Sequence, residues 1–318
     1  MDVQNIKERK NEVTAREGAW AIHSVHLGGE VYTTDEPSRD VRLRQIVQVV
    51  ADITNRPLDA LRIVDLACCE GIYGIEFALH GANVLNTEGR EVNLAKVRFV
   101  KDMLGLDNLE CALDDVRNLS QEKYGTFDAV LCLGILYHLD TPAAFEFVEK
   151  VADVCRRVAI IETHISLEAV ESCLWKGKTY WGVYGAEHNP NSGPEERLKA
   201  VFDSLDNVRS FWLTHASLCN LLRQVGFTSV YQCHIPPHEW EDAGKQYVWR
   251  DRVTLVAIKG QRHKLLSSPI TESTAEIVRQ EQPEIWPVWP APPEPKLKQT
   301  LKRHLHWRLR RLLRDLGT

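Results

Sequence analysis

The sequence predicts an α/β fold, with a Rossmann-like, mostly parallel sheet, helices on both faces, an antiparallel last strand and an inserted lid. The first observation is that short β-branched or apolar runs alternate with segments of helical periodicity from residue 62 onward. The second is that four predicted strands end in residues that suit a ligand site. The third is that strands 227–235 and 252–258 follow each other with only a long polar connection, which predicts an antiparallel last strand.

Each element has its own pattern. Residues 39–54 are predicted to form an amphipathic helix, whose apolar side chains recur at helical spacing: Leu43, Ile46, Val47, Val50 and Ile53. The alternation then consists of strand 62–67, helix 73–80, strand 83–88, helix 91–104, strand 109–115, strand 128–134, helix 141–155, strand 157–163 and helix 215–226. Strands 227–235 and 252–258 complete the sheet.

The chain is predicted to form one main domain with additions. Residues 1–58 form an N-terminal helical cap segment, and residues 59–260 form the main domain. Residues 165–213 are rich in aromatic and turn residues and form an insertion that covers the site as a substrate lid. Residues 261–295 form a Pro-rich linker, and residues 296–318 form a basic amphipathic helix.

The net charge of −5 is unevenly distributed. Residues 296–318 carry eight Lys/Arg and one acid, which gives +7 there and −12 over the rest of the chain. A leucine stripe with dense basic charge suits a membrane surface with anionic lipids, the phosphates of RNA, or a protein contact. The acidic body argues against tRNA as a partner.

The eight cysteines are scattered through apolar runs, without a CxxC pair or the spacing of a zinc site. They indicate reduced thiols. The N-terminus lacks the apolar core of a secretion signal, and no run approaches the length of a membrane span. We expect a cytoplasmic protein, with peripheral membrane contact as an option for residues 296–318.

The ends of the predicted strands carry the candidate chemistry. The first strand contains Asp65 and runs into a loop in which Ala67, Cys69 and Gly71 are small enough for backbone N–H groups to approach a ligand. The second strand ends at Glu88, at a spacing that suits hydrogen bonds to two ribose hydroxyls. The alternative for Glu88 is a solvated helix-capping acid.

The third and fourth strands end in further candidates. Asp115, followed by Val116, suits the amino group of an adenine, and its alternative is a helix N-cap. The fourth strand ends with Leu133 and Gly134, which permits a close backbone approach, and Tyr137 and His138 follow it. Ligands of open parallel sheets bind at these strand ends.

Taken together, the loop "DLACCEG", Glu88, Asp115 and "FDAVLCLGILYHL" resemble the motifs of class I S-adenosylmethionine-dependent methyltransferases. The resemblance covers roughly residues 60–165 and the strands within 227–258. It implies S-adenosyl-L-methionine as the cofactor. The residues that it implies for cofactor binding are Asp65, Ala67, Cys69, Gly71, Glu88, Asp115, Val116, Leu133 and Gly134. The family usually has glycine at the positions of Ala67 and Cys69.

Methyl transfer to a hydroxyl needs a side chain that removes the proton of the nucleophile. His138 is the first candidate because it follows the fourth strand, and His164, at the end of the fifth, is the second. A structural hydrogen bond is the alternative for each histidine. The histidines lack the spacing of metal ligands, so we expect no metal site.

Aromatic side chains in two segments are candidates for substrate contact. Trp20 and His23 precede the sheet, and Tyr180, Trp181 and Tyr184 lie in the insertion. The alternatives are a satellite aromatic cluster at the N-terminus and a small core inside the lid.

A more distant resemblance connects "GILYHLDTP" and "RVTLVAI" with transferases that carboxymethylate the wobble uridine of tRNA. In that family Tyr137 and Arg252 would help to hold the extra carboxylate of the cofactor, together with an N-terminal lysine that has no convincing counterpart between Thr14 and Ile46. The first interpretation is therefore O- or N-methylation of a small-molecule or glycan-type acceptor. The alternatives are a tRNA-modifying transferase and a non-catalytic cofactor-binding module.

Overall fold

The computed structural model describes residues 2–22, 24–34, 41–233, 251–264 and 266–267, which all lie in one compact unit, Met1–Gln282. The predicted basic helix 296–318 lies outside these residues, as does most of the predicted linker 261–295.

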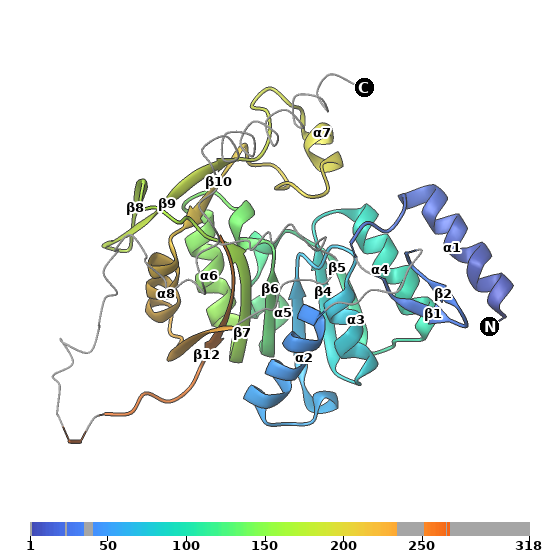
Figure 1. Ribbon diagram of the computed structural model, residues 1–318, viewed down its shortest axis with the longest axis horizontal. Coiled ribbons are helices and arrows are strands. Elements are labelled where there is room, and N and C mark those ends of the chain that lie inside the picture. The colour runs from blue at the N-terminus through green and yellow to red at the C-terminus, as the bar shows by residue number, and fades with distance from the viewer. Residues whose placement is uncertain (1, 23, 35–40, 234–250, 265, 268–318) are drawn as a thin grey trace, which may run out of the picture. The chain divides into compact units, whose positions relative to one another are not determined.

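The central sheet has seven strands in the order β11-β12-β7-β6-β3-β4-β5 (Figure 1). Its parallel strands are β3 (Arg62–Leu66), β4 (Asn83–Glu88), β5 (Leu109–Leu113), β6 (Phe127–Leu133) and β7 (Cys155–His164). Strand β12 (Arg252–Ile258) pairs antiparallel with β7, and β11 (Ser229–Cys233) pairs antiparallel with β12. This topology confirms the predicted fold class.

Helices cover both faces of the sheet because successive side chains of a strand point to opposite faces. On one face Val64 and Leu66 of β3 belong to a cluster with buried residues of α6 (Ala143–Val154) and α8 (His215–Gln224). On the other face Ile63 packs with residues of three helices. These are α2 (Val41–Thr54), α3 (Ile72–Leu79) and α4 (Glu91–Leu104).

The N-terminal segment contains a helix and a short hairpin. Helix α1 (Val3–Glu17) begins after Asp2, whose carboxylate accepts a hydrogen bond from the backbone N–H of Gln4. It packs on α4 through the buried Ile6 and Val13. Strands β1 (His26–Gly28) and β2 (Val31–Tyr32) form the hairpin, which the sequence patterns did not predict.

Residues 165–213 contain a second sheet. Strands β8 (Glu171–Trp175), β9 (Lys178–Ala186) and β10 (Arg209–Leu213) pair antiparallel in the order β10-β9-β8, and α7 (Pro194–Lys199) lies between β9 and β10 in the sequence. Strand β10 contacts the 3₁₀ turn η3 (Leu136–His138), where Phe211 N–H donates to Leu139 O at 2.9 Å. The insertion therefore reaches the carboxyl end of β6.

The remaining turns connect these elements. They are η1 (Leu58–Ala60), η2 (Val116–Asn118) and α5 (Gln121–Tyr124). All eight cysteines lie in the described residues and are free. Among the helices of the described residues, none has the length and apolar character to cross a bilayer.

Candidate active site

The loop after β3 keeps a left-handed backbone at the positions where it lacks glycine. Ala67 has φ of 52°, Cys69 has φ of 53° and Gly71 has φ of 78°. A left-handed conformation costs a residue with a Cβ about 1–2 kcal/mol, so this loop holds its shape against local strain. Such strain persists at functional sites, where surrounding contacts fix the backbone.

Glu88 supplies one of those contacts. Its carboxylate, 4% exposed, accepts hydrogen bonds from Cys69 N–H and Arg90 N–H, both at 2.9 Å. Burial raises the pKa of Glu88, and the two backbone N–H groups act in the opposite direction. The side chain thus joins the β3 loop to the turn before α4, and it is not the solvated cap of the alternative interpretation.

Asp65 is buried beneath the same loop, where its carboxylate accepts a hydrogen bond from Gly74 N–H at 3.1 Å. Burial raises its pKa from an ordinary 3.8 to about 7, the Gly74 N–H lowers it, and the Glu88 charge raises it. The side chain therefore fastens the start of α3 to β3.

The raised pKa of Asp65 predicts a pH dependence of stability. The pKa of Asp65 is higher in the folded protein than in the unfolded chain. Its contribution to the free energy of unfolding is therefore fully present below about pH 4 and is lost as the pH rises to about 7. Asp65→Asn should abolish this loss, because asparagine resembles the protonated acid. The free energy of unfolding of wild type should fall relative to that of the variant by at most about 1.4 kcal/mol per pH unit. Urea unfolding of both proteins across this range measures it, and parallel curves would contradict it.

Asp115 is engaged within its own turn. Its carboxylate accepts a hydrogen bond from Arg117 N–H at 2.8 Å and pairs with the Arg117 guanidinium, which also reaches Asp206 at 2.8 Å. The residue is the N-cap of η2, as the alternative interpretation holds, and its adenine role stays a prediction. Val116 is buried next to it.

Polar groups of β7, β12 and the turn η3 meet at the end of β6. Leu133 is half-buried, and Gly134, with φ of 86°, follows it. A Cβ on Gly134 would lie 3.7 Å from Glu162 Oε2 and 3.9 Å from both Arg252 Nη2 and Tyr137 Oη. Burial raises the pKa of Tyr137. Its hydroxyl therefore stays protonated at neutral pH, which makes it a hydrogen-bond donor rather than a base.

His138 forms a histidine–carboxylate pair with the insertion. Its Nδ1 lies 2.9 Å from Glu187 Oε2, and both side chains are largely buried. The same carboxylate oxygen accepts a hydrogen bond from Ser204 N–H at 2.9 Å, which fixes its orientation. With Nδ1 bound to the carboxylate, Nε2 is the nitrogen that can accept a proton.

His164 forms a second histidine–carboxylate pair, and its ring also contacts Tyr137. Its Nδ1 lies 3.3 Å from Asp251 Oδ2, an ion-pair distance without good hydrogen-bond geometry, and its ring stacks on Trp212 with centroids 5.1 Å apart. The Tyr137 ring lies 4.2 Å from that of His138 and 4.7 Å from that of His164. Burial raises the pKa of Asp251, and the nearby His164 lowers it below its ordinary value.

Arg252 pairs with a carboxylate of the protein itself. Its guanidinium donates through Nε and Nη2 to Glu162, whose Oε1 also lies 3.2 Å from Arg42 Nη1. Glu162 is 2% exposed. Two arginines therefore converge on one buried carboxylate beside Gly134.

The aromatic candidates of the N-terminus and insertion divide by burial. Trp20 is buried against Phe99, as the satellite-cluster alternative holds, and His23 lies outside the described residues. Tyr180 is 1% exposed and packs against Phe145, so it has no surface to offer a substrate and belongs to the core.

Trp181 and Tyr184 of the insertion are half-buried and retain accessible surface. The backbone N–H of Trp181 donates to Ser217 Oγ at 2.7 Å, and Tyr184 Oη lies 2.9 Å from Thr141 Oγ1. Their substrate role stays a prediction.

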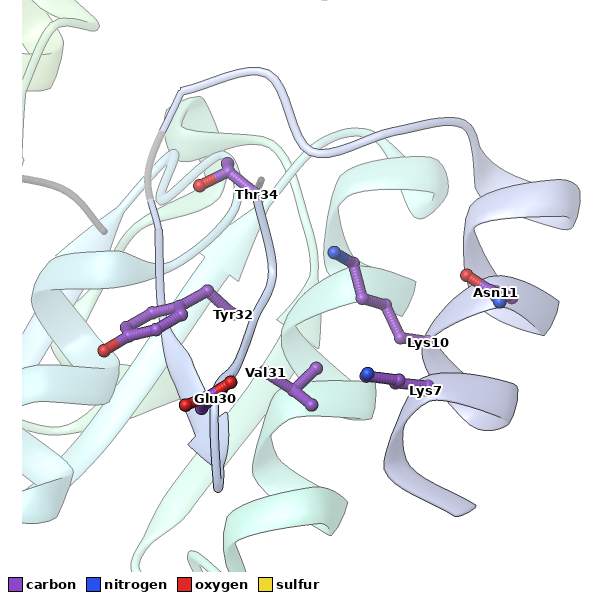
Figure 2. Close-up of a pocket in the computed structure, with 7 residues that line it drawn as sticks. All are labelled: Lys7, Lys10, Asn11, Glu30, Val31, Tyr32 and Thr34. Carbon is purple, nitrogen blue, oxygen red and sulfur yellow. The ribbon is translucent and has the colours of Figure 1, made fainter. Parts of the chain in front are cut away.

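A pocket of about 220 Å³ lies elsewhere, between α1 and the β1–β2 hairpin. Figure 2 shows Lys7 and Lys10 reaching from α1 toward the hairpin residues Glu30 and Val31. It is open, and none of its lining residues comes from the carboxyl ends of the sheet strands. The polar residues around Glu88, Gly134 and His138 define the candidate active site at those strand ends, away from this pocket. No group of three or more metal-ligating side chains close enough to hold an ion occurs in the described part of the chain.

Comparison with known proteins defines the class. Residues 63–157 match the family model described as a methyltransferase domain. With the sheet order above, this match identifies a class I S-adenosylmethionine-dependent methyltransferase domain.

Among curated proteins, the ubiquinone biosynthesis O-methyltransferase of Acinetobacter baumannii (strain AYE) is 26% identical over 128 residues, which are 40% of this chain and 50% of that protein. The protein of the same name from Methylocella silvestris is 30% identical over 125 residues, which are 39% and 47% of the two chains. The chain thus spans about half the length of the curated relatives it matches.

A solved structure shares the fold over most of the chain. The N-terminal domain of EvdMO1, crystallised in the presence of SAH and D-fucose, superposes with a TM-score of 0.61 at 23% identity. The match covers 82% of this chain and 98% of that domain.

Sequence patterns missed the partners of the candidate residues. The fold brings four further residues to the strand ends, and the sequence patterns marked none of them as a site residue: Glu187, Asp251, Trp212 and Arg42. Glu162 carried a signal, because it lies in the acidic end of the predicted fifth strand.

Proposed function

We propose that this protein transfers the methyl group of S-adenosylmethionine to a hydroxyl oxygen of a small, glycan-type molecule, with His138 as the general base. The observation that carries the proposal is the His138–Glu187 pair at the end of β6, where the Nδ1–Oε2 distance is 2.9 Å. A histidine oriented by a buried carboxylate is the arrangement that general-base catalysis uses.

The residues of the strand ends fit the cofactor. The methionine portion would bind beside loop 67–71. Ala67, Cys69 and Gly71 have left-handed backbone conformations there, and their small side chains would let the ligand approach the backbone. Each oxygen of the Glu88 carboxylate accepts one hydrogen bond from a backbone N–H and has a further lone pair. These lone pairs would accept hydrogen bonds from the ribose hydroxyls. Gly134 leaves room at the β6 end.

The bound cofactor supplies an electrophilic methyl group on a sulfonium. His138 Nε2 would take the proton of the acceptor hydroxyl as the oxygen bonds to the methyl carbon, and the carbon–sulfur bond would break to leave the neutral thioether SAH. Glu187 then stabilises the imidazolium that results, because its carboxylate is buried and held by Ser204 N–H. The Tyr137 ring contacts this base and meets the ring of Trp212 edge-on, and both residues are half-buried. Aromatic side chains of this kind would suit the apolar face of a sugar.

Several observations support the acceptor class. The curated relatives are named O-methyltransferases, which favours oxygen as the acceptor atom. The charge of −12 over residues 1–295 opposes the phosphates of a nucleic acid. EvdMO1 was crystallised with D-fucose, which makes deoxy sugars the first members of a test panel.

Carboxymethyl transfer is a second candidate, because Arg42 provides a cation from the N-terminal segment beside Arg252. However, both arginines pair with Glu162, whose negative charge offsets part of their positive charge. Less positive charge is therefore left to bind the extra carboxylate of such a cofactor. Methyl transfer therefore remains the first proposal.

The test uses the full chain with tritiated methyl donor and a panel of free and nucleotide-linked sugars, catechols and bulk tRNA. We expect label in a sugar, with a product mass that corresponds to one methyl group. Label confined to catechols or tRNA, or no label with any acceptor, would contradict the proposal.

A further inference from the structure

Arg90 is a buried arginine in the turn between β4 and α4, and the proposed chemistry does not use it. Its side chain enters the insertion and lies among backbone carbonyls of the end of α7 and of the segment that follows it. Nε lies 3.0 Å from Leu198 O, and Nη2 lies 3.0, 3.0 and 2.9 Å from the carbonyl oxygens of Ala200, Asp203 and Ser204. The residue is 8% exposed.

The Arg90 guanidinium caps these backbone carbonyls at the end of α7 and just after it. A helix leaves its last carbonyls without partners, and a guanidinium has donors in a fixed plane but no acceptors. Burying a charged group is unfavourable unless hydrogen bonds compensate it. The carbonyls supply that compensation, and the Arg90 side chain therefore ties the insertion to the β4 turn.

A second contact joins the same two segments. A Cβ on Gly89 would lie 2.5 Å from Leu205 Cδ1, so the insertion packs directly on the backbone beside Glu88. Glycine at position 89 therefore permits this close approach.

A line of hydrogen bonds continues from Arg90 to the base. The backbone N–H of Arg90 donates to Glu88, and its guanidinium donates to Ser204 O. The N–H of Ser204 donates to Glu187, which holds His138. Each of these contacts is 2.9 Å long. Glu88, at one end, is the residue proposed to bind the ribose.

We propose that Arg90 is a positioning residue that couples the cofactor site to the catalytic base. It holds Ser204 in place, and Ser204 in turn orients Glu187 and His138. Cofactor binding that orders the Glu88–Arg90 turn therefore also orders the base. The coupling rests on the proposed function, whereas the anchoring of the insertion does not.

The anchoring is tested first in the cofactor-free protein by hydrogen exchange. Arg90→Gln should raise the exchange of residues 198–208 by at least about tenfold, because the carboxamide cannot reach as many carbonyls. Arg90→Lys should give a smaller increase, since an ammonium keeps the charge with fewer directed donors. The control is Lys176→Gln, which removes an exposed ion pair between the insertion and Glu149 of α6 and should leave this segment unchanged.

The coupling is tested by a double-mutant cycle. Arg90→Gln and Glu187→Gln should each lower kcat, and the double variant should be about as slow as the slower single variant. Arg90→Gln should weaken SAH binding less than it lowers kcat, and Arg90→Lys should restore part of kcat. A merely structural role would lower both kcat and the melting temperature without this non-additivity.

Two results would overturn the proposal: unchanged exchange of residues 198–208 in Arg90→Gln, or kcat effects of Arg90 and Glu187 that multiply independently. If Arg90→Gln does not fold, Arg90→Lys carries the same comparisons. If wild type neither binds SAH nor transfers methyl, the proposed function and the coupling fail, while the exchange experiment still decides the anchoring.

Discussion

His138→Gln is expected to lower kcat by about 10²- to 10⁴-fold, the range for loss of a general base. Glutamine keeps a polar side chain of similar reach but has no nitrogen that takes up a proton at neutral pH. Glu187 would lose its histidine partner, yet Ser204 N–H still binds its carboxylate. SAH binding should therefore change by less than about threefold.

Initial rates with the labelled sugar and calorimetry with SAH measure this prediction. His80→Gln is the matched control, because His80 lies on the surface at the end of α3 and pairs only with Glu76 in the described residues, at 3.1 Å. It should keep the wild-type kcat. A loss in His138→Gln below about threefold would assign the base elsewhere, with His164 as the next residue to replace.

Glu88→Gln is expected to weaken cofactor affinity about ten- to a hundredfold, a loss of about 1.5–3 kcal/mol. Both carboxylate oxygens face backbone N–H donors, from Cys69 and Arg90, at 2.9 Å. A glutamine presents its amide nitrogen to one of them, so one acceptor is lost and two donors oppose each other. The same change removes an acceptor from the ribose.

Calorimetry with SAH measures the affinity, and a thermal melt accompanies it because Glu88 also holds the strained Cys69. Glu110→Gln is the control, since Glu110 is an exposed acid on the adjoining strand β5. It should bind SAH like wild type. Unchanged affinity in Glu88→Gln would show that the ribose binds elsewhere.

Most of the central fold could be predicted because its signals are local. The predicted strand 83–88 and helix 91–104 coincide with β4 and α4, since the short strand-type run and the helical periodicity each extend over a whole element. The β1–β2 hairpin was missed because strands of three and two residues carry no periodicity. The strands of the insertion were missed because its Gly, Pro, Asn and Ser residues are typical of turns and loops.

The candidate site could be predicted only where it lies at the ends of strands. Glu88, Gly134 and His138 follow from the rule that ligands bind at the carboxyl ends of a parallel sheet. Glu187 lies 49 residues after His138, and no spacing rule connects a strand end with a partner in an insertion. Arg90 also gave no signal, because an arginine at a helix start ordinarily points to solvent.

The loop after β3 shows how composition can mislead about geometry. Ala67 and Cys69 lack the freedom of glycine, which predicts an altered loop, yet both adopt the left-handed conformation. The contact of Cys69 N–H with Glu88, at 2.9 Å, offsets part of the strain. The backbone conformation here follows from tertiary contacts, which the sequence of the loop alone does not contain.

The binding of the cofactor at the strand ends is tested by a crystal structure of the full chain with SAH. We expect the ribose hydroxyls to lie within hydrogen-bond distance of the Glu88 carboxylate and the sulfur to face the segment from Gly134 to His138. Density for SAH away from both, or no binding in solution at saturating SAH, would contradict it.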